Sequence, residues 1–142
     1  MSPDPDRVAT WLPALQSMAA EAPLTLRVRG ECMWPLAGDA MWIQVAGPAR
    51  RYWPGDVVVA LIDGPGLVLH RVIGAYPRGG QWKYLTQGDR SPRPDLAIPP
   101  ARILGRVSGG ECSPLLIAVP LRHRLRALRR GIHFAARRLL GR

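Results

Sequence analysis

Several residue types are scarce in this sequence, and each scarcity excludes a class of protein. The two cysteines, Cys32 and Cys112, are too few for a disulfide framework and lack the close spacing of a zinc site. No run of about 18 apolar residues is present, so no transmembrane helix is expected. The first residues are acidic and lack the basic region of a secretory signal. We therefore expect a cytoplasmic protein, or a peripheral one at the inner membrane surface, with no metal and no cofactor.

Acidic residues are absent from residues 121–142, which hold eight arginines. Because the whole chain has a net charge of +10, the remainder is close to neutral. The apolar residues of this segment recur every three or four positions, at Leu121, Leu125, Leu128, Ile132, Ala135 and Leu139. This pattern predicts a basic amphipathic helix that is either solvated or contacts an anionic membrane or a partner protein. Nucleic acid fits less well, because nothing in the chain resembles a module that reads DNA.

Fifteen prolines and fifteen glycines argue against a helical bundle and favour a turn-rich, mostly β protein. A helix is expected over 7–21, capped by Asp6 and shortened or kinked by Pro13. Strands are expected over 24–29, 41–45, 56–62, 67–73, 81–86 and 103–107, of which 56–62 is buried on both faces. The chain is thus divided into an N-terminal helix (1–23), a β domain (24–119) and a C-terminal helix (120–142).

Five short motifs follow one another along the predicted strands. A cysteine motif, Gly30-Glu31-Cys32-Met33-Trp34-Pro35, is followed by Gly38-Asp39. The later motifs are Gly55-Asp56-Val57-Val58, His70-Arg71-Val72, Gly88-Asp89 with Asp95 downstream, and Gly105-Arg106-Val107. In this order they resemble the signal peptidase and LexA-like peptidase superfamily, over roughly residues 24–107. The resemblance implies a mostly β, partly barrel-like domain with flanking helices and a peptidase site.

The resemblance places Cys32 where the superfamily has a serine nucleophile and His70 where many members have a lysine base. A histidine before an arginine is similar to the endoplasmic-reticulum and archaeal signal peptidases, and the only lysine, Lys83, does not match the position of the base. The two replacements are chemically compatible, because an imidazole titrates near neutral pH and an imidazolium favours the thiolate of a neighbouring cysteine. The alternatives are an inert core cysteine and a degenerate, inactive site.

An imidazole base needs a third group that fixes its orientation. Asp95 is the predicted partner of His70, and Asp89 is the second candidate, expected mainly to hold its own loop. The main-chain N–H of Cys32 is expected to donate to the oxyanion. The residues predicted to bind substrate surround the nucleophile: Met33, Gly30 and Trp34. For Met33, plain core packing is an equal alternative.

These features predict limited proteolysis of a peptide or protein substrate, such as removal of a leader from a precursor peptide, by a Cys32–His70 dyad. Two other functions stay open. One is a non-catalytic module of the same fold that holds an extended peptide by strand addition. The other is self-cleavage, for which Ala-Ala and Ala-Gly pairs occur at 19–20, 46–47 and 135–136.

Overall fold

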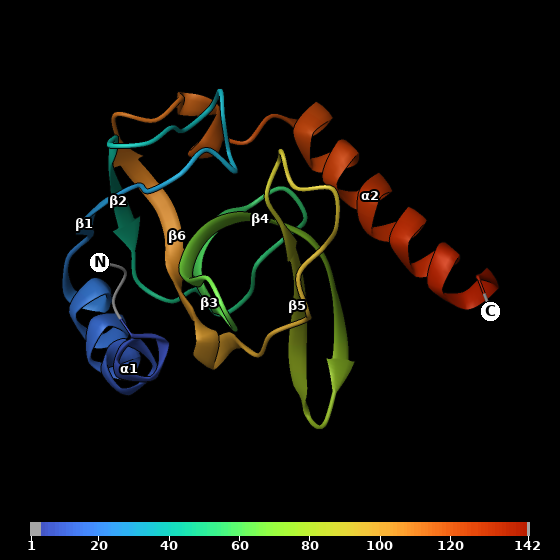
Figure 1. The fold of residues 1–142 in the computed structure, drawn as a ribbon, viewed down its shortest axis with the longest axis horizontal. Coiled ribbons are helices and arrows are strands. Elements are labelled where there is room, and N and C mark those ends of the chain that lie inside the picture. Colours follow the sequence, from blue (N-terminus) through green and yellow to red (C-terminus); the bar gives the residue numbers. More distant parts are fainter. Residues whose placement is uncertain (1–3, 142) are drawn as a thin grey trace.

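A single antiparallel sheet of six strands lies between two helices in the computed structural model, which describes residues 4–141 (Figure 1). In chain order the elements are α1 (Pro5–Glu21), β1 (Leu24–Arg27), β2 (Trp42–Ala46), β3 (Val57–Ile62), β4 (Gly66–Arg78), β5 (Gln81–Gln87), β6 (Ile103–Gly110) and α2 (Leu121–Leu140). Short 3-10 turns at Pro100–Arg102 and Pro114–Leu116 flank β6. The predicted mostly β class with an N-terminal and a C-terminal helix is therefore confirmed.

The sheet is not closed into a barrel, which corrects the prediction of a partly barrel-like domain. Its strand order is β1-β2-β6-β3-β4-β5, so β1 and β5 are edges. The four residues of β1 pair with β2, and β5 pairs with β4. These two edge strands do not pair with each other. The outer side of β5 is partly covered by the loop that follows it, because Tyr84 pairs with Ile98 and the Thr86 carbonyl accepts the Asp95 N–H.

The central strand β3 is buried on both faces, as its continuous apolar sequence predicted. It pairs with β4 on one side and with β6 on the other. Successive side chains of a strand point to opposite faces, so Val57, Val59 and Leu61 join one apolar cluster and Val58, Ala60 and Ile62 join another. The first cluster also contains Leu12 and Ala19 of α1, which explains how the N-terminal helix is held against the sheet.

The helix α1 begins earlier than predicted, because Asp4 caps it instead of Asp6. The Asp4 carboxylate accepts a hydrogen bond from the Asp6 N–H, at 3.1 Å. The helix continues through Pro13, which has no N–H to donate to the carbonyl four residues earlier. Because Pro13 is exposed, water can hydrate that carbonyl instead.

The hairpin of β4 and β5 is longer than the sequence pattern predicted. It extends to Arg78 and Gln81, which pair across a two-residue turn. Gly79 and Gly80 form that turn with φ of 61° and 77°, a region that glycine enters without steric cost. The β3–β4 hairpin turns at residues 63–65, between the paired Ile62 and Gly66.

The predicted C-terminal helix is present as α2 and packs against β4. Ala127 of the helix is buried with Ile73 of β4, and Gly131 lies so close to the Ile73 carbonyl that no Cβ would fit. Arg124 also pairs with the buried Asp56 carboxylate at 2.9 Å. The helix is thus fixed to the β domain by small and charged residues.

Within residues 4–141, no helix has the length and apolar character needed to cross a membrane.

Candidate active site

Cys32 lies in a loop of consecutive turns between β1 and β2. Gly30, with φ of 82°, starts this loop and donates its N–H to the Asp39 carboxylate at 2.9 Å. The Cys32 carbonyl accepts a hydrogen bond from the Arg90 N–H at 2.9 Å. The cysteine loop is therefore tied to the loop that follows β5, although the two are far apart in the sequence.

The Cys32 thiol and the His70 imidazole lie side by side. Cys32 is half-buried and its Sγ donates to the carbonyl oxygen of Leu69, at 3.4 Å, the residue before His70. A Cβ placed on Gly88 would lie 3.1 Å from Cys32 Cβ and 3.1 Å from His70 Nε2, so both side chains border the same small space. The Cys32 side chain also contributes to raising the pKa of His70.

The other ring nitrogen of His70 is held by Asp95. The distance from His70 Nδ1 to Asp95 Oδ2 is 2.6 Å. The same carboxylate oxygen accepts a hydrogen bond from Thr86 Oγ1 at 2.7 Å, and the Asp95 N–H donates to the Thr86 carbonyl at 2.8 Å. Thr86 is fully buried on β5 and was not identified from the sequence. The sequence carried one signal for it: in the alternating pattern of β5, Thr86 falls on the same face as Tyr84, which is buried.

The surroundings of His70 favour its protonated form. Burial by itself lowers the pKa of the imidazole, but the hydrogen bond to Asp95, the charge of that carboxylate and the neighbouring Cys32 outweigh it. Together they raise the pKa of His70 to about 9 from 6.5. At neutral pH the site therefore holds an imidazolium between a carboxylate and a thiol, the arrangement that favours a thiolate.

This titration predicts a pH dependence of stability. Since the pKa of His70 is raised from 6.5 to about 9, its contribution is complete below pH 6.5 and is lost as the pH rises through 9. We expect the free energy of unfolding to fall by on the order of 3 kcal/mol over this window. Urea denaturation at closely spaced pH values measures it. His70→Gln removes the titrating group and should remove this part of the decline; an identical decline in both proteins would contradict the assignment.

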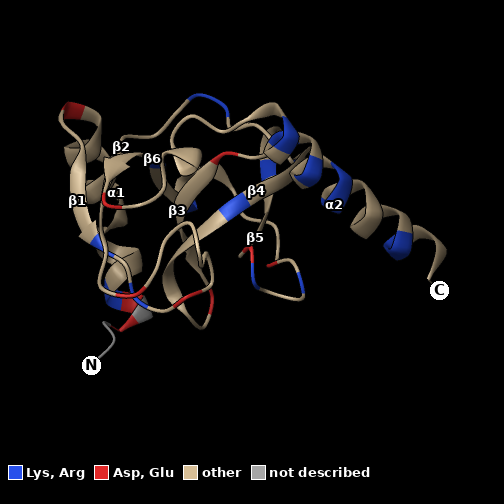
Figure 2. Ribbon diagram, turned by 90° about the horizontal axis from the view of Figure 1, so that it is seen from above, with Lys and Arg blue, Asp and Glu red and all other residues tan. Residues whose placement is uncertain are grey.

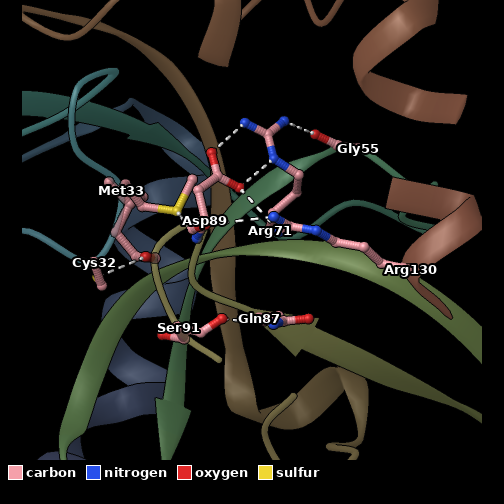
Figure 3. A network of polar contacts seen from close by, with 9 residues as sticks. Cys32, Met33, Gly55, Arg71, Gln87, Asp89, Ser91 and Arg130 are labelled. Atoms are coloured by element: carbon pink, nitrogen blue, oxygen red, sulfur yellow. Dashed lines mark hydrogen bonds and ion pairs between the residues drawn. The ribbon is translucent and has the colours of Figure 1, made fainter. Parts of the chain in front are cut away.

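Asp89 forms a separate network with Arg71 (Figure 3), whereas the carboxylate bonded to His70 is that of Asp95. Its two carboxylate oxygens accept hydrogen bonds from the buried Arg71 guanidinium at 2.8 and 2.9 Å. Arg71 also donates to the Gly55 carbonyl at 2.8 Å, and Arg130 of α2 approaches Asp89 at 4.0 Å. The Asp89 N–H donates to Met33 Sδ at 3.3 Å. Asp89 thus connects its own loop to β4, α2 and the cysteine loop.

A cleft of about 390 Å³ opens beside Cys32. Its lining comes from α1, β1, β2, β3 and the start of β4: Val8, Leu26, Arg27, Val28, Arg29, Ile43, Val59 and residues 65–69. In the described structure β1 pairs only with β2, and residues 66–70 of β4 pair only with β3, since β5 joins β4 from Arg71 onward. The cleft is therefore bordered by two strand edges that no further strand covers, although the Leu69 carbonyl on one of them accepts the Cys32 thiol.

The three residues predicted to bind substrate lie outside this cleft. Met33 is buried in the core, where its sulfur accepts the Asp89 N–H. Trp34 is exposed and lines a different pocket with residues of α2. Gly30 shapes the backbone before Cys32. The cleft residues that the sequence analysis missed belong to expected strands, and their alternating apolar pattern carried no sign that a cleft would form there.

Gly88 offers a test of the space between Cys32 and His70. In Gly88→Ala the new Cβ would lie 2.6 Å from Ser91 Oγ and 3.1 Å from both Cys32 Cβ and His70 Nε2, so these groups must move. We expect a folded protein whose Cys32 is alkylated about tenfold more slowly. The matched control is Gly74→Ala, because no atom lies within 4 Å of its Cβ. Wild-type rates in both variants would show that Cys32 and His70 do not share this space.

Cys112 is a natural reference for Cys32. It is buried, and burial raises the pKa of its thiol.

Among residues 4–141, no three His, Cys, Asp or Glu side chains gather in a way that could hold a metal ion.

A comparison of the chain with protein-family models and with curated proteins finds no match. Inference of function therefore depends on the residues and the geometry described above.

Proposed function

We propose that this protein is a peptidase that cuts an extended peptide with Cys32 as nucleophile. The observation that carries the proposal is the line of three side chains, in which His70 binds Asp95 through Nδ1 and faces Cys32 on the other side. Nucleophile, base and orienting carboxylate in this relation are the recurring elements of acyl-transfer sites on unrelated folds.

The reaction would use the thiolate–imidazolium pair directly. The Cys32 sulfur attacks the carbonyl carbon of the scissile bond, and the resulting oxyanion accepts a hydrogen bond from the Cys32 N–H. The C–N bond then breaks and His70 gives its proton to the leaving amine, which leaves a thioester. His70 next takes a proton from water, whose oxygen attacks the thioester. The carboxylic acid product leaves and the Cys32 thiolate is regenerated beside the imidazolium.

The cleft indicates how the substrate would bind. Its floor is apolar, with Ile43 and Val59, and two strand edges flank it. An extended peptide could pair with these edges through its backbone and place a carbonyl at Cys32. Such pairing requires an unfolded segment, which favours limited proteolysis of a leader or precursor peptide. A reducing compartment such as the cytoplasm would keep Cys32 a free thiol.

The positions of the motifs also support the resemblance to signal peptidases and LexA-like proteins. Cys32 follows β1, His70 lies within β4, and both aspartates follow β5. The matching order of motifs and elements makes a divergent, cysteine-dependent member of that superfamily our proposed assignment.

The proposal is tested by incubating the protein with a peptide library prepared from a digested proteome and identifying new termini by mass spectrometry. Cleavage by the wild type and none by Cys32→Ala is the expected result. No new termini with either protein would count against a peptidase of broad specificity.

The open strand edges also favour a second function, in which the cleft holds a peptide without cutting it. Equal retention of library peptides by the wild type and Cys32→Ala, with no cleavage, would support this function. The intact mass of the wild type after incubation tests self-cleavage. The Ala-Ala pairs at 19–20 and 135–136 lie within helices, where the backbone is not extended, and this disfavours cleavage at either pair.

A further inference from the structure

Most of the large apolar residues of α2 lie away from its contact with the β domain. The helix contacts the sheet through Arg124, Ala127, Gly131 and Phe134, which recur every three or four positions. The larger apolar residues lie on another side of the helix and form what we call the leucine stripe: Leu121, Leu125, Leu128, Ile132 and Leu139. Their exposed fractions run from 41% to 79%. Because side chains advance by about 100° per residue, these five lie on one side of the helix.

The leucine stripe continues onto the β domain. Trp53, Tyr76 and Trp82 are exposed large aromatic residues, and we call them the aromatic patch. A groove of about 410 Å³ is lined by all three and by Leu128 and Ile132 of the stripe. The stripe on α2 and the patch on the β domain therefore border the same groove.

Basic residues accompany this apolar surface. The guanidinium of Arg51 lies 5.6 Å from the ring centroid of Trp53 and 5.1 Å from that of Trp82. The helix α2 itself carries seven arginines and no acidic residue, and its basic positions lie in its first half and again near its C-terminal end (Figure 2). The surface thus combines exposed leucines, exposed tryptophans and one sign of charge.

We propose that the leucine stripe and the aromatic patch together bind an anionic lipid bilayer. Leucine side chains would enter the acyl boundary, tryptophan and tyrosine would lie at the headgroup level, and the arginines would pair with lipid phosphates. The contacts of Arg124 with Asp56 and of Gly131 with Ile73 hold α2 against the β domain, so stripe and patch keep a fixed relation to each other. The proposal goes beyond the proposed peptidase function and does not depend on it.

The charges disfavour the other occupants of such a surface. Pairing of two leucine stripes in a dimer would bring together two helices that each carry seven arginines and no acid. A nucleic acid would satisfy the arginines, but it would leave the exposed leucines and tryptophans in water. An anionic bilayer satisfies both the charge and the apolar side chains.

The test is flotation of the full chain with vesicles of phosphatidylcholine alone or mixed with phosphatidylglycerol. We expect binding to the anionic vesicles that weakens in high salt, and little binding to the neutral ones. Leu125→Asp on the stripe and Trp53→Ser on the patch should each lower the partition coefficient by about tenfold or more, because each removes a large apolar side chain from the contact.

The control is Leu96→Asp, which changes a leucine that is even more exposed than Leu125, in the loop after β5 and outside the proposed surface. It should bind vesicles like the wild type, and circular dichroism should show that all three variants are folded. Three results would overturn the proposal: equal binding to neutral and anionic vesicles, unchanged binding by Leu125→Asp and Trp53→Ser, or a dimer in light scattering that Leu125→Asp dissociates.

Discussion

Replacing His70 by glutamine is expected to slow the alkylation of Cys32 by about tenfold at neutral pH, because the imidazolium that favours the thiolate is lost. In the wild type we expect iodoacetamide to modify Cys32 at least about tenfold faster than Cys112, whose thiol is buried and whose pKa is raised by burial. Mass spectrometry of the two cysteine-containing peptides over time gives both rates from one sample.

His133→Gln is the matched control for this experiment. It makes the same substitution on the exposed side of α2 and should leave the rate at Cys32 unchanged. Equal rates at Cys32 and Cys112 in the native protein, or equal rates at Cys32 with and without His70, would mean that the thiol is not activated. The nucleophile of the proposed reaction would then be in doubt, while the fold would be unaffected.

The second large effect concerns the two aspartates after β5, which we expect to give opposite phenotypes when changed to asparagine. Asp89→Asn should lower the free energy of unfolding by about 3 kcal/mol, because it leaves the buried Arg71 guanidinium without its carboxylate. Asp95→Asn should keep the fold but lower the pKa of His70, since the charged hydrogen-bond partner of Nδ1 is lost. Urea denaturation, together with the alkylation rate of Cys32, separates the two outcomes.

The control for the stability arm is Asp63→Asn, which removes an exposed ion pair with Arg102 and should cause no measurable change. Normal stability and lost Cys32 reactivity in Asp89→Asn, with unchanged reactivity in Asp95→Asn, would reverse the two roles. The present geometry favours the stated assignment, because the only carboxylate bonded to the His70 ring in the described structure belongs to Asp95.

Asp89 also connects the candidate site to α2. Asp89 touches Arg71 in β4 and Arg130 in α2, and its N–H reaches the sulfur of Met33 next to Cys32. A displacement of α2 would therefore shift Asp89, and through Asp89 the cysteine loop. This contact gives a physical reason why a helix at the end of the chain can matter for a site at the start of the sheet.

The elements of the fold were predictable because their signals are local. Alternation marked β1, the unbroken apolar run marked β3, and the three- and four-residue spacing marked α2. Errors occurred where a competing local signal existed. Asp4 and Asp6 are both suitable caps for α1, and the Gly79-Gly80 turn extends the β4–β5 hairpin beyond the predicted strands.

The sequence by itself determined the chemistry available to this protein: one thiol and one imidazole in ordered motifs, two nearby aspartates, and a helix rich in arginine and leucine. Only the tertiary structure decided which groups meet. The path of the loop after β5 brings Asp95 to His70 and Asp89 to Arg71, and the packing of Ala127 and Gly131 on β4 turns the leucines of α2 away from the protein. Residue spacing reports the period of one element, whereas these contacts join separate elements and depend on strand register and close packing.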